Sequence, residues 1–121
     1  MIDREIIKTD KNPNKIDYKI ELESIIEIKN RKISVSILYI PHDFILIVKD
    51  FEKYLEQFSD SGALKIEEIA GQILDDLNNE LIPRKIELTL EEKLGKSCHK
   101  VMMEDTQPGW KDTSKTLTEA A

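Results

Sequence analysis

The sequence has few of the residues that cross-link, bend or anchor a chain: its 121 residues include one cysteine, four glycines and four prolines. A lone cysteine, Cys98, cannot form an internal disulfide, which excludes a disulfide scaffold and favours a reducing, cytoplasmic compartment. The low glycine and proline content excludes collagen-like and low-complexity chains. No apolar run approaches the roughly 20 residues that a bilayer span needs, so we expect no membrane partner.

The sequence also has no excess of positively charged residues. Lysine and arginine number 18 against 24 aspartates and glutamates, which gives a formal net charge of −6. An acidic domain repels a phosphate backbone, so we expect no nucleic-acid partner. The densest basic cluster, Lys29-Asn30-Arg31-Lys32, falls where a hairpin turn is expected, and we interpret it as a solvated turn.

The residues that are present are typical of one globular domain. Hydrophobic residues make up 40% and charged residues 35% of the chain, and its length suits a single domain. We expect an N-terminal arm over residues 1–15, one folded domain over residues 16–104 and a flexible C-terminal tail over residues 105–121. Within that tail Trp110 and Leu117 are the only large apolar residues.

Four stretches alternate between apolar and polar residues, which is the period of a half-buried strand. The first begins at Ile16 and the second covers Ile33–Tyr39, with a short polar link between them, so the two predict an antiparallel hairpin. The stretches Ile86–Leu90 and Lys96–Glu104 predict two more strands.

Between these two pairs of strands the apolar period becomes that of a helix. The spacing i, i+3, i+4, i+7 predicts a helix over about residues 50–58 with Asp50 as its N-cap, and a second stripe predicts a helix that Pro83 ends. The segment Phe44–Val48 fits either a short buried strand or the lead-in to the first helix. The two stripes consist of Phe51, Tyr54, Leu55 and Phe58, and of Ile66, Ala70, Ile73 and Leu77.

The predicted order is therefore β-β-α-α-β-β, an α+β fold with a four-stranded antiparallel sheet and two helices on one face. Such a sheet has two open edges, and an unpaired edge is a template for pairing with another chain. We expect a homo-oligomer that joins through its sheet edges.

Several short motifs occur along this order with specific spacing. They are Asn12-Pro13-Asn14, Tyr39-Ile40-Pro41, Lys49, Tyr54-Leu55, Phe58 and Pro83-Arg84. Over about residues 12–92 they resemble the 7-cyano-7-deazaguanine reductases of queuosine biosynthesis, the QueF family. GTP cyclohydrolase I is similar over a shorter stretch. Both families have the tunnelling fold, and the resemblance implies that fold, a purine- or pterin-like ligand and, through Lys49, the cofactor NADPH.

The resemblance also implies a ligand-anchoring glutamate. In these families a glutamate near the start of the second helix binds the edge of a purine or pterin at an interface between subunits. The reductase register places Glu67 there and the cyclohydrolase register places Glu68 there, so both are candidates for substrate binding. A carboxylate can accept two parallel hydrogen bonds from such an edge. The alternative is that both acidic residues only complement the dipole of the helix.

The chain also departs from both families. The reductases carry a nucleophilic cysteine and an aspartate in a loop between the first two strands, and residues 24–31 contain neither. Ile66 replaces the histidine before the anchoring glutamate, while Ile47 and Glu52 replace two residues of the nicotinamide-binding segment. The zinc ligands of the cyclohydrolase are unmatched, so no metal is expected.

These departures predict a divergent QueF-like protein that binds a purine, deazapurine or pterin heterocycle at a subunit interface. We do not expect NADPH-dependent nitrile reductase activity, and the resemblance identifies no catalytic residue. The alternatives are a catalytically inactive structural or oligomerisation subunit and a GTP cyclohydrolase-like hydrolase.

Two adjacent pairs of reactive or charged residues have simpler interpretations. Cys98 and His99 lie next to each other on a predicted strand, so their side chains face opposite sides of the sheet and cannot form a dyad within one chain. Asp75 and Asp76 are interpreted as solvated helix surface.

Overall fold

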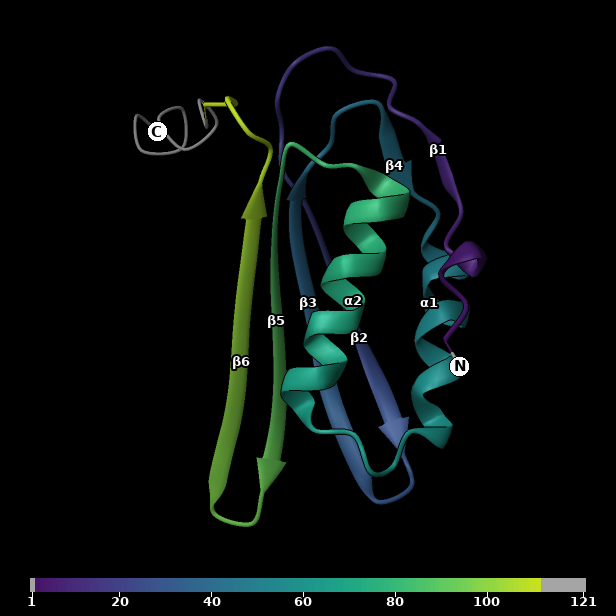
Figure 1. The fold of residues 1–121 in the computed structure, drawn as a ribbon, viewed down its shortest axis with the longest axis vertical. Helices are drawn as coiled ribbons and strands as arrows, with labels where there is room; N and C mark the ends of the chain where they lie inside the picture. Colours follow the sequence, from purple (N-terminus) through teal and green to yellow (C-terminus); the bar gives the residue numbers. More distant parts are fainter. Residues whose placement is uncertain (1, 112–121) are drawn as a thin grey trace.

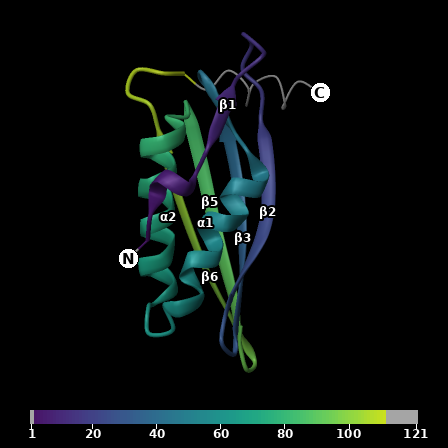
Figure 2. The ribbon, with the colours of Figure 1, turned by 90° about the vertical axis from the view of Figure 1, so that its right-hand side faces the viewer.

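Four long strands form one antiparallel sheet in the order β2-β3-β5-β6, and two helices cover one of its faces (Figures 1 and 2). The computed structural model describes residues 2–111, so the part of the predicted tail over residues 112–121, with Leu117, lies outside the described residues. The predicted α+β order β-β-α-α-β-β is confirmed. Its elements are β2 (Ile20–Ile28), β3 (Arg31–Ile40), α1 (Val48–Glu56), α2 (Ile66–Leu81), β5 (Lys85–Leu94) and β6 (Ser97–Thr106).

A small second sheet fixes the N-terminal segment. After the short 3-10 helix η1 (Arg4–Ile6), strand β1 (Thr9–Lys11) pairs antiparallel with β4 (Phe44–Leu46). The segment Phe44–Val48 was predicted to be either a short strand or the lead-in to the first helix, and it contains both. Strand β4 ends one residue before the N-cap of α1.

The start of α1 differs from the prediction. Its N-cap is Ile47, whose carbonyl oxygen accepts from the backbone nitrogens of Asp50 and Phe51 at 3.1 Å each. Asp50 therefore lies in the first turn rather than at the cap, where its charge complements the helix dipole. The reason is that β4 leads straight into the helix without an intervening loop.

Both predicted helical stripes face the core. The residues of the first stripe are buried in α1 and in the following 3-10 helix η2 (Gln57–Asp60), and those of the second stripe are buried in α2. Helix α2 ends at Leu81, two residues before Pro83, and Ile82 takes a left-handed conformation with φ of 48°. This agrees with the predicted stop, because the residue before a proline disfavours the helical region.

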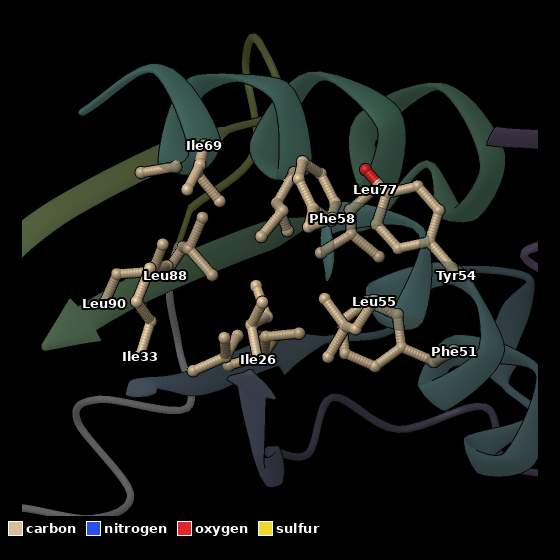
Figure 3. Close-up of a cluster of buried hydrophobic side chains, with 14 of the residues drawn as sticks. Ile26, Ile33, Phe51, Tyr54, Leu55, Phe58, Ile69, Leu77, Leu88 and Leu90 are labelled. Atoms are coloured by element: carbon tan, nitrogen blue, oxygen red, sulfur yellow. The ribbon is translucent and has the colours of Figure 1, made fainter. Parts of the chain in front are cut away.

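The core lies between the sheet and the helices, and Figure 3 shows its side chains pointing toward one another from both layers. Phe51 stacks on Tyr54 with ring centroids 5.9 Å apart, and Tyr54 meets Phe58 edge-on at 5.6 Å. This run of three aromatic rings packs the end of α1 and η2 into the core.

The other face of the sheet carries the alternate residues. In β6, Cys98, Lys100 and Met102 lie on this open face, which matches the predicted alternation. Strand β2 pairs residue by residue with β3, so Ile25 also lies on the open face, where it is 57% exposed. Among the described residues, no helix combines the length and apolar character needed to cross a bilayer.

Candidate functional site

The candidate site lies at the end of the sheet where α2 begins. Arg31, the first residue of β3, has the same strand parity as buried Ile33 and so faces the helical side. Its guanidinium binds both carboxylate oxygens of Glu92 on β5, with Nε–Oε2 at 2.6 Å and Nη2–Oε1 at 3.0 Å. Glu92 is only 4% exposed and the Arg31 side chain is 24% exposed, so a buried carboxylate meets a guanidinium at the rim of the core.

The same guanidinium also holds the loop that leads into α2. Its Nη1 donates to the carbonyl oxygens of Leu64 at 2.8 Å and Gly62 at 3.4 Å. Arg31 thereby ties β5 to the chain just before the first turn of α2. The interpretation of residues 29–32 as a solvated turn is wrong for Arg31, because its strand parity turns it inward to a buried partner.

Each member of this pair stabilises the charge of the other. Hydrogen bonds from Arg31 lower the pKa of Glu92 from its ordinary value, against the effect of burial, which raises it. In turn, the hydrogen bond to Glu92 raises the pKa of Arg31. Both groups are therefore charged at neutral pH.

Glu67 lies beside the edge strand of the sheet. Its Oε2 is 3.4 Å from Nε2 of His99 on β6, and its side chain is 55% exposed. His99 is directly opposite Glu92 in the β5–β6 register and helps to lower the pKa of that carboxyl. A polar row thus crosses the inner side of the sheet end from Arg31 through Glu92 and His99 to Glu67.

Glu68, the other candidate, has a different position. Its Oε1 accepts from the backbone nitrogen of Lys65 at 3.4 Å, so the side chain turns back toward the start of its own helix. Glu67 instead faces β6. The structure thus gives Glu67 and Glu68 different surroundings, although the resemblance to the two families made both of them candidates for the same role.

Lys49, the candidate for cofactor binding, is exposed in the first turn of α1. Helices α1 and α2 run antiparallel, so their first turns lie at opposite ends of the helical layer (Figure 1). Within one chain the fold therefore does not bring Lys49 near Glu67 or Glu68.

Cys98 and His99 face opposite sides of the sheet, as the strand pattern predicts. The Sγ of Cys98 donates to Oε1 of Glu91 at 2.8 Å on the open face, and this hydrogen bond raises the pKa of the thiol. A raised pKa leaves less thiolate, so Cys98 is a poor nucleophile here. Within residues 2–111, no three His, Cys, Asp or Glu side chains gather to hold a metal ion.

Asp76 is a buried polar residue that the sequence pattern did not identify. It is 3% exposed, and the interpretation of Asp76 as solvated surface is wrong. Its Oδ2 accepts from the Tyr54 hydroxyl at 2.5 Å and from Nε2 of Gln72 at 2.9 Å. Burial and this contact raise the pKa of Tyr54, which keeps the phenol protonated as a donor. The sequence does contain a signal for the burial of Asp76. It lies three residues after Ile73, which places it on the core-facing stripe of α2.

A hollow near the N-terminal arm is remote from Glu67. It is a groove of about 590 Å³ whose lining includes Asn12, His42 and Phe44. Arg84 in its wall pairs with Asp17, with Nε–Oδ1 at 3.1 Å. These residues lie at the Pro41 end of the sheet, whereas Glu67 lies at the Arg31 end, so the groove is not part of the candidate site.

The chain matches no family model and no curated protein. Among solved structures, the archaeosine synthase QueF-Like in the apo form matches with a TM-score of 0.58 and 18% sequence identity. The match covers 75% of this chain and 94% of that chain. The chain has the tunnelling fold. This confirms the fold that the QueF-like resemblance implied, and at this identity the likeness shows the fold alone.

Proposed function

We propose that this tunnelling-fold protein binds a purine, deazapurine or pterin heterocycle through Glu67 at a subunit interface. The observation that carries the proposal is the position of the exposed Glu67 carboxylate beside β6, the edge strand of the sheet. A guanine or pterin edge presents two adjacent N–H donors, and one carboxylate can accept both.

Glu67 fits this role better than Glu68. A ligand at a subunit junction must meet an accessible carboxylate near the sheet edge, and the Glu67 side chain is 55% exposed beside β6. Glu68 would first have to leave its contact with the Lys65 backbone nitrogen. The clamp of Arg31 on Glu92 and on the Leu64 carbonyl fixes the helix start that carries Glu67.

The interface would form between the two free edges of the sheet. Strands β2 and β6 are nine and ten residues long, and among residues 2–111 each pairs on one side only. Pairing of β6 of one copy with β2 of the next satisfies both edges and sets residues of the second copy beside Glu67.

Nitrile reduction is not part of this proposal. Strand β2 turns directly into β3 where the reductases carry their nucleophile loop, and Cys98 lies on the face away from Glu67. Lys49 stands apart from Glu67 within one chain, so a role for it with NADPH requires a second copy. A structural subunit without a ligand is the alternative, and ligand binding distinguishes the two.

Binding of 7-deazaguanine or pterin is expected to depend on Glu67. Loss of a charge-assisted hydrogen-bond pair is worth about 1.5–3 kcal/mol, so Glu67→Gln should weaken the affinity roughly 10- to 100-fold in isothermal titration calorimetry. Glu68→Gln is the matched control and should stay within about threefold of the unmodified protein, because its carboxylate faces the helix start.

The choice of ligand sharpens this test. Hypoxanthine lacks the exocyclic amine, offers only one of the two N–H donors and should bind more weakly than guanine. If neither 7-deazaguanine nor pterin binds the unmodified protein, the heterocycle proposal is wrong and the structural subunit is favoured. Equal losses for Glu67→Gln and Glu68→Gln would contradict the assignment of Glu67.

The proposed edge pairing predicts a change of oligomeric state. Ile25 on β2 and Met102 on β6 are 57% and 72% exposed on the open face, next to the two edges. The double variant Ile25→Lys, Met102→Lys should shift the mass from multiples of 14.0 kDa toward the monomer in size exclusion with light scattering. Ile16→Lys, also 72% exposed but off the sheet, should leave the mass unchanged. A monomeric unmodified protein would refute edge pairing.

A further inference from the structure

We propose that His99 is a positioning residue that orients the Glu67 carboxylate for the heterocycle, an inference that rests on the proposed function above. The imidazole Nε2 lies 3.4 Å from Oε2 of Glu67, across the gap between the edge strand and the helix. His99 is far from Glu67 in sequence, and only the packing of α2 over β6 brings the two together.

The environment of Glu67 on its own helix offers no such support. The residues one helical turn after Glu67, which are Ala70 and Gly71, carry no polar side chain. Glu68, which follows Glu67 directly, turns to the Lys65 backbone nitrogen. The polar contact that orients Glu67 therefore comes from another element, the strand β6.

The groups around the imidazole explain why it can hold this position. Glu67 faces it from α2, and Glu92 faces it from β5 as its partner in the strand register. The charge of Glu92 is compensated by two hydrogen bonds from Arg31 on β3. Strand parity places the ring on the inner side of β6, between the compensated carboxylate of Glu92 and the exposed carboxylate of Glu67.

Contact with His99 leaves the binding capacity of Glu67 intact. A carboxylate has about four lone-pair sites on its two oxygens, and the imidazole lies beside one of those oxygens only. Both oxygens stay available to a pair of ligand N–H groups. An exposed glutamate otherwise loses rotamer freedom when it binds a ligand, and prior orientation by His99 reduces that loss.

Calorimetry with 7-deazaguanine tests this role through three variants. His99→Phe keeps a ring without a donor and should weaken binding about 5- to 10-fold, whereas His99→Gln keeps an N–H donor and should stay within about threefold. In a Glu67→Gln background, His99→Phe should have no further effect, because the carboxylate that it orients is gone. Thermal unfolding of each variant checks that the fold is intact.

Nuclear magnetic resonance of the imidazole rings provides a second, direct readout. The chain has two histidines. The other one, His42, lies near the opposite end of the sheet, with its Nδ1 3.4 Å from Nε2 of Gln107. Addition of 7-deazaguanine should shift the His99 ring signals and leave those of His42 in place. In Glu67→Gln, the same ligand concentration should leave both unchanged.

The outcomes separate the two proposals. If the unmodified protein binds neither 7-deazaguanine nor pterin, the proposed function fails and the role of His99 fails with it. If Glu67→Gln loses binding while His99→Phe binds as well as the unmodified protein, the proposed function stands and the positioning role is overturned. Unshifted His99 signals at saturating ligand would also overturn it.

Discussion

Replacement of Phe58 by alanine is expected to lower the free energy of unfolding by about 3–5 kcal/mol. Phe58 is fully buried, and its ring meets Tyr54 edge-on at 5.6 Å. Figure 3 shows it between the helices and the sheet, close to Leu55 and Leu77. It belongs to η2, which continues α1 and packs against β2. The cavity would lie where three elements meet, so none of them can close it alone.

Urea unfolding followed by circular dichroism measures this loss at a fixed protein concentration, because self-association would add to the apparent stability. Phe44→Ala is the matched control: Phe44 is 39% exposed at the edge of the small β1–β4 sheet, so its removal should cost well under half as much. A loss below about 1 kcal/mol for Phe58→Ala would show that the site collapses around the smaller side chain.

The burial of Phe58 could be predicted because apolar spacing alone determines it. The same holds for the inner residues of the strands and for the stop of α2 before Pro83. Apolar spacing cannot detect a polar residue on an inner stripe. Asp76 and Glu92 both occupy such positions, and their partners Tyr54 and Arg31 lie 22 and 61 residues away in the sequence. Only the packing of helices and the register of strands reveals those pairs.

The candidate site could likewise be predicted only in part from the sequence. Strand alternation alone placed Cys98 and His99 on opposite faces. It could not show that His99 meets Glu67, because that contact depends on the position of α2 over the edge strand. The pairing of β1 with β4 was also beyond prediction, since the three residues of β1 carry too short a pattern to be recognised as a strand.

Replacement of Arg31 by methionine is expected to cost about 3–5 kcal/mol at neutral pH, because it leaves the Glu92 carboxylate buried without a counter-charge. The loss also includes the hydrogen bonds to the carbonyl oxygens of Leu64 and Gly62. The double variant Arg31→Met, Glu92→Leu should recover much of the stability, because no uncompensated charge remains. Arg4→Met is the surface control: its pair with Glu80 is half exposed on the arginine side and should contribute at most about 1 kcal/mol.

The pH dependence of this loss has a defined sign. In the folded protein the pKa of Glu92 lies below its ordinary value of 4.5, so the stabilisation is fully present above that pH and is lost as the pH falls through the lowered value. Without Arg31, the effect of burial on Glu92 outweighs that of nearby His99 and raises the pKa of the carboxyl, so the variant regains stability on acidification. The difference between the two proteins should therefore be largest at pH 7 and shrink toward pH 4. Urea unfolding at both values measures it, and a difference that is constant over this range would mean that Arg31 acts through packing rather than through the charge of Glu92.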